Sequence, residues 1–533
     1  MMTARRLSLL RTIAPTRAAW LALLTVCLGG LAGGERECSA ASPELAAARG
    51  ELERDYAEEL EKLATWCDEQ DLTEEAQSTR AWNRPRDPRT IYLVELPSRI
   101  GWSMPPEGAE PAVADWHTRF GELRRAHADK LFQLSRQALR QHASWLAVEL
   151  ILEAARQDPD HEPARRLLGY RKFRGAWRTA FERQQLAGGK VWHETFGWLP
   201  KGHVAHYEKG ERFVDTRWVS AEEDAALHQD INDAWKLTTD HYTVTTNHSR
   251  EAGVQLGVRL EKLYRAWHQV FMRYYASEAE IAKLLDGAAA KPIPQRRFNV
   301  TYFRDRQQYQ QALEGHVPRD IVTSGIYLGD HRTAYFYANE DGKQDFSTLY
   351  HEATHQLFGE SRPVARNLGR DGNFWIIEGI ACYMESFRPA DDEGSSDVPM
   401  TDASPKASLE APREPTLGGR DAQRYLDARF RLLEDDFHVP LEELTAWDMG
   451  RLQREPRIAM VYSQAAGLTH FLMHYDDGRY RDSLIQYLGK IYGGQADNNT
   501  LAELTGVPNA ELDQQYRDFL SEQDAKPQGQ RQP

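Results

Sequence analysis

"YHEATHQLFGE", residues 350–360, carries two histidines four positions apart, with a glutamate directly after the first. On an α-helix, residues i and i+4 lie on one face, so His351 and His355 can point their imidazoles at a single cation. Glu352 lies one position round the helix, where it can accept a proton from a water molecule beside that cation. The alternative is a half-buried helix with two hydrogen-bonded histidines, and this short stretch alone does not decide between the two.

A catalytic zinc ion needs three protein ligands and one open position, so a third ligand is expected elsewhere in the chain. The stretch "NFWIIEGIACYMES" (373–386) is almost wholly apolar and contains Glu378. A buried carboxylate without a partner is costly, and zinc is the expected partner. Asp371 or Asn373 is expected to cap the start of this helix. Glu385 returns to the face of Glu378, where it either orients a ligand histidine or is an ordinary surface acid.

Together, "HEATH" (351–355) and "WIIEGIACYME" (375–385) resemble the paired motifs of the gluzincin zinc metallopeptidases, most closely those of the aminopeptidase N branch. The resemblance implies a thermolysin-like catalytic domain, built from a small mixed sheet and a helical lobe. It also implies one Zn²⁺ ion held by His351, His355 and Glu378, with Glu352 as the general base. The resemblance extends more weakly over residues 238–523 and says nothing about residues 43–235.

A further stretch, "VYSQAAGLTHFL" (461–472), resembles the helix of that branch which carries a tyrosine over the substrate. The resemblance implies that Tyr462 donates its hydroxyl to the oxyanion, a role that suits a phenol held near a metal. The alternative is a buried core tyrosine, with His470 and His474 as other possible donors.

The chain departs from the aminopeptidases before the zinc helix, where a G-x-M-E-N strand is replaced by "TAYFYANEDG" (333–342). Recognition of a free N-terminus is therefore not expected. The strand at 333–339 is expected to be an exposed edge that pairs with an extended peptide.

Length and composition limit the other possibilities. The chain has 533 residues, of which 41% are hydrophobic, so two to four domains with sizeable cores are expected. It has 80 acidic and 66 basic residues and a net charge of −14, which gives no electrostatic basis for binding nucleic acid.

The N-terminus has the pattern of a secretory signal. Basic residues precede the apolar run "AAWLALLTVCLGGLAGG" (18–34), and the small residues "CSAAS" (38–42) follow. This pattern predicts a signal peptide over residues 1–40 and export to the periplasm or the exterior. The alternative is an uncleaved anchor, which is the only membrane contact expected. Cys67 and Cys382 lie beyond the signal, and one bridge between them is permitted in an oxidising compartment.

The expected fold class is α+β, with a mainly helical N-terminal region before the catalytic domain. Residues 144–170 show the helix–turn–helix cadence of a tetratricopeptide-like unit, although a solenoid needs several such repeats. His203 and His206 are expected to have surface or packing roles. The expected segments are an N-terminal helical segment and linker (43–112), a helical tetratricopeptide-like region (113–189), a short-strand connector (190–235), a catalytic domain (236–523) with a mobile loop (387–419), and a disordered tail (524–533).

The leading expectation is a zinc-dependent peptidase that acts on a peptide or protein substrate. The rival is an exported binding module, whose helical N-terminal half captures a protein partner while the zinc site is inert or structural. Glu352 weighs against the rival, because a structural zinc site has no use for a base. A hydrolase of non-peptide amides is a third possibility.

Overall fold

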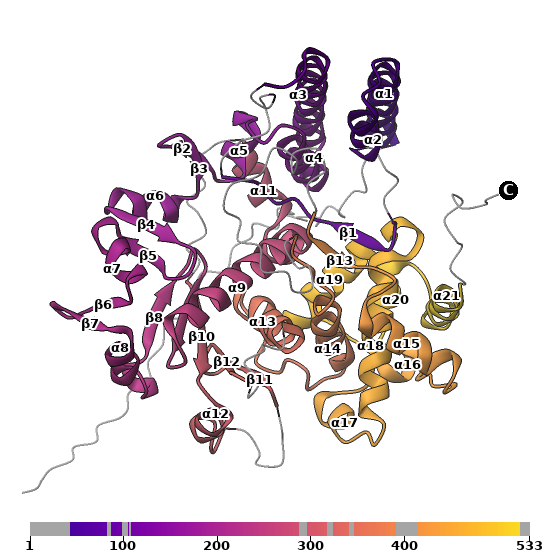
Figure 1. Ribbon diagram of the computed structural model, residues 1–533. Helices are drawn as coiled ribbons and strands as arrows, with labels where there is room; N and C mark the ends of the chain where they lie inside the picture. Colours follow the sequence, from indigo (N-terminus) through magenta and orange to yellow (C-terminus); the bar gives the residue numbers. More distant parts are fainter. Residues whose placement is uncertain are drawn as a thin grey trace, which may run out of the picture. The chain divides into compact units, whose positions relative to one another are not determined.

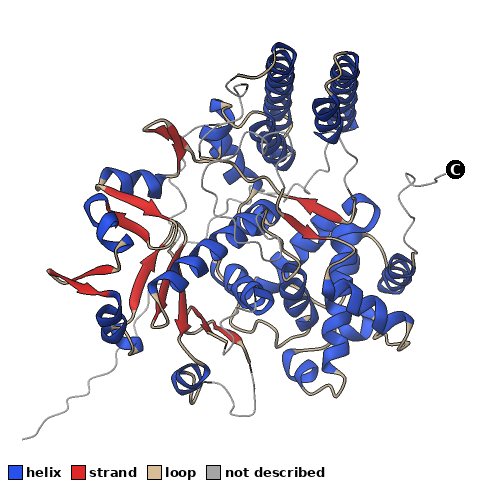
Figure 2. Ribbon diagram, in the orientation of Figure 1, coloured by secondary structure: helices blue, strands red, loops and turns tan. Residues whose placement is uncertain are grey.

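The computed structural model mixes helices with small sheets, consistent with the α+β class (Figures 1 and 2). The chain from Ala41 onward forms one compact unit. The predicted signal peptide, most of the predicted mobile loop and the predicted tail lie outside the described residues. The structure describes residues 43–82, 87–98, 105, 108–286, 296–316, 323–339, 346–390 and 414–522. Over these ranges, none of the helices has the length and apolar character needed to cross a membrane.

The N-terminal region is helical, as predicted. It contains α1 (Pro43–Glu69), α2 (Thr73–Trp82), α3 (Pro111–Arg140), α4 (Ser144–Gln157) and α5 (Glu162–Leu167). Leu150 and Ile151 of α4 are buried with Ile281 and Leu285, which belong to a helix more than a hundred residues later. The N-terminal helices therefore share a hydrophobic core with residues that the sequence assigned to the catalytic domain.

The helical prediction for residues 113–189 is wrong at residues 171–178, where a β-hairpin opens the first of three units of β-hairpin and short helix (Figure 2). Polar turns with positive φ, at Arg174–Gly175 in the first unit and Asp215 in the third, close two of the hairpins. The units comprise β2 (Arg171–Phe173), β3 (Ala176–Arg178) and α6 (Ala180–Ala187); β4 (Lys190–His193), β5 (Gly197–Pro200), η1 (Lys201–His203) and α7 (Val204–Glu208); and β6 (Glu211–Val214), β7 (Arg217–Ser220) and α8 (Ala221–Leu227).

These units form an internal repeat. The second strand of each carries a tryptophan, at Trp177, Trp198 and Trp218, so the spacing is 21 and then 20 residues. Later tryptophans pack on a ring of the preceding short helix or its end: Trp198 on Phe181, Trp218 on His206, and Trp235 on His228. Because Trp235 opens the main sheet, only residues 228–234 separate the repeat from the sheet.

The main sheet has five strands, in the order β11-β12-β10-β9-β8. Strands β9, β10 and β12 run parallel to one another, and β8 and β11 are antiparallel to their neighbours. A Cβ atom at Gly253 of α9 would lie 2.5 Å from Leu237, so this helix approaches the sheet unusually closely. The strands are β8 (Trp235–Thr238), β9 (Tyr242–Thr246), β10 (Phe298–Phe303), β11 (Gly325–Leu328) and β12 (Thr333–Tyr337). The short helix η2 (Ile231–Asp233) precedes them, and the helices between them are α9 (Arg250–Val270), α10 (Met272–Tyr275), α11 (Glu278–Leu285) and α12 (Arg306–Ala312).

The prediction that the strand at 333–339 is an exposed edge is wrong. Among the described residues, β12 is paired on both sides, with β11 and with β10, and β11 forms the edge. The chain folds back after Leu328, so β11 pairs antiparallel with β12 and occupies the edge position that residues 333–339 were expected to hold.

The remaining elements form a helical lobe. Within it, α14 and α18 cross so closely that a Cβ atom at Gly379 would lie 2.8 Å from the carbonyl oxygen of Ala465. The lobe contains α13 (Phe346–Glu360), α14 (Phe374–Met384), β13 (Thr416–Gly418), α15 (Gln423–Leu433), α16 (Leu441–Leu444), α17 (Met449–Gln453), α18 (Ile458–His474), η4 (Tyr475–Gly478), α19 (Arg481–Tyr492), α20 (Thr500–Thr505) and α21 (Asn509–Ser521).

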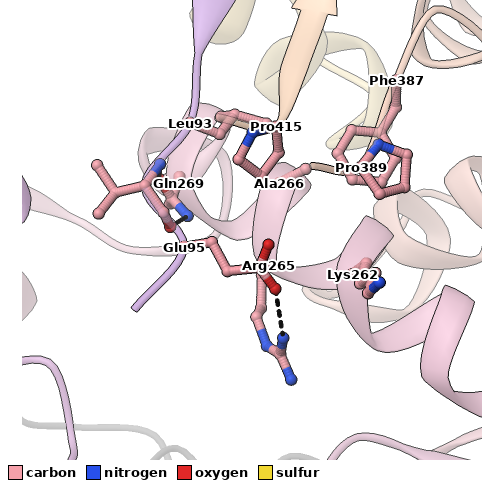
Figure 3. Close-up of a pocket in the computed structure, with 10 residues that line it drawn as sticks. Leu93, Glu95, Lys262, Arg265, Ala266, Gln269, Phe387, Pro389 and Pro415 are labelled. Atoms are coloured by element: carbon pink, nitrogen blue, oxygen red, sulfur yellow. Dashed lines mark hydrogen bonds and ion pairs between the residues drawn. The ribbon is translucent and has the colours of Figure 1, made fainter. Parts of the chain in front are cut away.

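An N-terminal strap, residues 87–94, crosses onto this lobe. Its strand β1 (Thr90–Tyr92) pairs with β13, and Arg89 is buried, with hydrogen bonds to the Tyr425 hydroxyl (2.6 Å) and the Phe519 carbonyl (3.2 Å). Beyond β1, both backbone polar groups of Val94 bond to the Gln269 side chain, beside a shallow pocket (Figure 3). The strap therefore contacts the helical lobe through Arg89 and β1, and helix α9 through Val94.

The ends of the predicted mobile loop are ordered. Arg388 forms an isolated antiparallel bridge with Thr416, the first residue of β13. The loop prediction at these ends was wrong because a Pro- and Ser-rich composition does not reveal pairing with a distant strand.

Candidate metal centre

Helix α13 places His351 and His355 on one side and packs its other side into the core. Leu349, Ala353 and Leu357 are fully buried, whereas both histidines are half-buried. The apolar residues therefore fix the rotation of the helix, and that rotation turns both imidazoles toward α14, its neighbour in Figure 1.

Helix α14 brings Glu378 to these histidines. Its Oε2 atom lies 3.3 Å from Nε2 of His351 and 3.6 Å from Nε2 of His355, and the two Nε2 atoms are 3.2 Å apart. Glu378 is 8% exposed, in a helix whose other residues are all buried as well. The structure thus brings the three ligands predicted from the sequence into one group.

The geometry of this group fits a divalent cation. Ligand atoms of a four-coordinate zinc, with bonds of about 2.0–2.1 Å, lie roughly 3.3 Å from one another. The three observed distances of 3.2, 3.3 and 3.6 Å are close to that value. His351, His355 and Glu378 could therefore hold a metal ion.

The hydrogen bonding of His351 supports the same conclusion. Its Nδ1 atom lies 2.9 Å from Oε1 of Glu385, so the ring proton belongs on Nδ1, donated to that carboxylate. The Nε2 atom then presents a lone pair to the Glu378 carboxylate, an arrangement that needs a cation or a proton between them. Burial alone would raise the pKa of Glu378, but His355 and His351 hold this pKa well below its usual range.

Glu352 is held beside the group and does not join it. Its Oε2 atom accepts a hydrogen bond of 2.8 Å from the backbone N–H of Tyr327, in the edge strand β11. Removal from water raises the pKa of Glu352, although His351 and His355 oppose the shift. A raised pKa brings a carboxylate closer to the value that suits proton transfer near neutral pH.

Glu385 receives four hydrogen bonds at the end of α14. Its Oε1 accepts from His351 Nδ1 (2.9 Å) and from Arg424 Nη2 (3.0 Å), and its Oε2 accepts from Ser347 Oγ (2.8 Å) and Arg424 Nε (2.7 Å). Burial would raise the pKa of Glu385, but these partners lower it to about 2. Of the two roles expected for Glu385, the contact with a ligand histidine is the one that the structure shows.

Tyr462, on α18, lies close enough to Glu378 to be affected by the charge of that carboxylate. The side chain is half-buried, and burial together with the Glu378 charge raises its pKa. The phenol therefore stays protonated and can donate a hydrogen bond, which is the state that the predicted role requires.

His470 and His474 do not lie at the metal centre as alternative donors. Both are 2% exposed and pack against Tyr383. The Tyr383 hydroxyl lies 2.8 Å from Nε2 of His474, and the Pro88 carbonyl lies 3.3 Å from its Nδ1. The sequence suggested these histidines because they share a helix with Tyr462, but their burial leaves them no access to a substrate.

The predicted cap of α14 is wrong in its chemistry. Asn373 occupies the N-cap position, but in a left-handed conformation (φ 56°) without a side-chain cap hydrogen bond. Its amide instead donates to the Asp497 carbonyl (3.1 Å) and accepts from the Tyr487 hydroxyl. Asn373 therefore ties the start of the Glu378 helix to the C-terminal lobe.

The structure also places the two cysteines and the two histidines discussed from the sequence. Cys67 and Cys382 are both buried and free, so the permitted bridge is not formed. His206 stacks on Trp218 with ring centroids 4.0 Å apart, and His203 lies 4.9 Å from the same ring, which agrees with the packing role expected for this pair.

Two features of the centre could not be found in the sequence. Arg424 follows the predicted loop on an amphipathic helix, where an arginine is ordinary. The Tyr327 N–H group is a backbone donor, and its contact with Glu352 depends on where strand β11 ends up. Neither feature leaves a sequence signal.

Comparisons of the chain with protein-family models, with curated proteins and with solved structures find no match.

Proposed function

We propose that this protein is a zinc-dependent peptidase of the gluzincin type. The observation that carries the proposal is the meeting of His351, His355 and Glu378 at distances that suit one cation, with Glu352 held directly beside them. The motif resemblance described above supports zinc as the metal and a peptide bond as the target. A purely structural site would not need a carboxylate outside the ligand group.

In this proposal, His351, His355 and Glu378 would hold a zinc ion, which would supply Lewis-acid polarisation of the scissile carbonyl and of the attacking water. Glu352 accepts the proton of the water and later donates it to the leaving amine. The Tyr327 N–H group holds the Glu352 carboxylate in one orientation throughout. Tyr462 donates its hydroxyl to the oxygen that becomes negatively charged.

The same proposal places an extended substrate along β11. This strand is the edge of the sheet among the described residues, and it contacts the base through Tyr327. Peptides commonly add to such an edge by main-chain hydrogen bonds. The predicted signal peptide further supports export of the enzyme, with its substrates outside the cytoplasm.

The test is hydrolysis of a mixed peptide library by the purified full-length protein, with cleavage products identified by mass spectrometry. Cleavage that stops on chelation and returns with added Zn²⁺ would support the proposal. Stoichiometric zinc binding without cleavage of any peptide would instead favour the inert binding module, and cleavage that survives complete metal removal would refute the mechanism.

A further inference from the structure

Every donor around Glu385 comes from another element of the fold. Ser347 and His351 belong to α13, Arg424 belongs to α15, and Glu385 itself ends α14. The Glu385 side chain is 7% exposed, so water does not replace these donors easily. The carboxylate is therefore the point at which three helices meet behind the candidate metal ligand.

The guanidinium of Arg424 hydrogen-bonds to both carboxylate oxygens of Glu385. Its Nε atom lies 2.7 Å from Oε2 and its Nη2 atom lies 3.0 Å from Oε1, the fork-to-fork arrangement that fixes the plane of a carboxylate. With this plane fixed and Oε1 already accepting from Arg424, Oε1 can accept the hydrogen bond of the His351 Nδ1–H group from one direction. The plane of the His351 ring, and hence the direction of its Nε2 lone pair, follows from that hydrogen bond.

We propose that Arg424 is a positioning residue, which orients His351 for metal binding by clamping Glu385. The inference rests on the metal centre of the proposed function, but not on peptide hydrolysis. Within the part of the chain that the structure describes, Arg424 forms hydrogen bonds and an ion pair with Glu385 and none with His351, His355 or Glu378, so its effect passes through Glu385. Loss of the guanidinium leaves a buried carboxylate without its cation, free to turn or to take up a proton, and His351 loses its fixed partner.

The measurement is the dissociation constant for Zn²⁺, obtained by competition with a chromogenic chelator on the metal-free full-length protein. For Arg424→Met we expect affinity about 10–100-fold weaker than wild type, the usual cost of losing a contact behind a metal ligand. For Arg424→Lys, which keeps the charge but not the fork, we expect an intermediate loss.

Arg431→Met is a matched control. Arg431 lies on the same helix, its side chain has the same 36% exposure as that of Arg424, and it pairs with Asp435 on the surface. We expect this variant to bind Zn²⁺ as tightly as wild type. The thermal midpoint of the metal-free protein separates a positioning role from a structural one, because a positioning role weakens metal binding without a matching loss of midpoint.

A double variant tests whether Arg424 affects Zn²⁺ binding through Glu385. If Arg424 acts only through Glu385, then Glu385→Gln with Arg424→Met binds Zn²⁺ no more weakly than Glu385→Gln alone. The visible absorption of the Co²⁺-loaded protein should change in Arg424→Met and not in Arg431→Met, because it reports ligand geometry.

The outcomes are distinguishable. If the wild-type protein binds no Zn²⁺, the metal centre and the proposed function both fail. If the wild type binds Zn²⁺ and Arg424→Met binds it equally well, or if the double variant shows additive losses, the positioning role of Arg424 is refuted while the metal centre stands. If Arg424→Met does not fold, Arg424→Lys is measured in its place, and an affinity for Zn²⁺ equal to that of wild type refutes the positioning role.

Discussion

The backbone N–H of Tyr327 donates a 2.8 Å hydrogen bond to Oε2 of Glu352, and this bond joins the edge strand of the sheet to the helix of the candidate metal ligands. A backbone donor cannot rotate away as a side chain can. The position of the base is therefore set by the sheet itself, and any distortion of β11 is transmitted to Glu352.

Replacement of Glu352 by glutamine should separate proton transfer from metal binding. The amide oxygen can still accept the Tyr327 hydrogen bond, so the fold and one zinc per chain should be retained. We expect kcat for peptide cleavage to fall by about 10²–10⁴-fold, the usual contribution of a general base. Glu434→Gln, at an exposed acid, is the control and should cleave normally. Undiminished cleavage by Glu352→Gln would remove Glu352 from the mechanism.

Replacement of Tyr462 by phenylalanine should affect the chemical step alone. The ring packing stays, but the hydroxyl that would donate to the oxyanion is lost. We expect kcat to fall by about 10²–10³-fold, the cost of removing one donor to an oxyanion, with KM and zinc content unchanged. Steady-state kinetics and metal analysis provide the check, with Tyr475→Phe as the comparison. A change in KM alone would mean that Tyr462 binds substrate without helping the reaction.

Acid should destabilise the fold through His470 and His474. Burial lowers the pKa of His474 to about 3 and that of His470 well below the ordinary value, and Arg89, Arg420 and Arg481 add to these shifts. An unfolded histidine has a pKa of about 6.5, so between that pH and the folded pKa only the unfolded chain gains the proton. Their contribution to stability is thus complete above about pH 6.5 and declines as pH falls.

The size of this effect can be measured by urea unfolding at pH 7.5 and pH 5. Each buried histidine should remove about 2 kcal/mol over that interval, since one pKa unit corresponds to about 1.4 kcal/mol. His470→Phe keeps an aromatic ring in the cluster and should shrink the difference between the two pH values by about that amount. An identical difference in wild type and His470→Phe would show that other groups govern the acid response.

Replacement of Arg89 by methionine should loosen the strap on the helical lobe. Arg89 is 4% exposed and donates to the Tyr425 hydroxyl and to the Phe519 carbonyl. Two charge-assisted bonds to buried acceptors would be lost, so we expect the free energy of unfolding to drop by about 3 kcal/mol. The control is Arg429→Met, which removes a surface hydrogen bond to the Glu522 carbonyl and should cost less than about 1 kcal/mol. Equal losses in the two variants would contradict the anchoring role of Arg89.

Local patterns in the sequence predicted the helices of the metal centre well. The i, i+4 spacing of His351 and His355 and the apolar run around Glu378 each follow from side-chain chemistry within one helix.

Features that depend on distant partners could not be predicted. The pairing of β1 with β13 joins residues more than three hundred positions apart, and Arg424 reaches Glu385 only because α15 packs on α18. The repeat at 171–227 did leave a signal, the even spacing of Trp177, Trp198 and Trp218. That signal was missed because each unit is short and its helix resembles the helices before it.

The close contact at Gly379 also couples the positions of α14 and α18. The carbonyl of Ala465 and the hydroxyl of Thr469 both lie within 3 Å of the position of a Cβ atom at Gly379, so no side chain fits between α14 and α18 there. Glu378 and Tyr462 lie one on each of these two closely packed helices. A helix shift that separates these two side chains therefore requires α14 and α18 to part at the Gly379 contact.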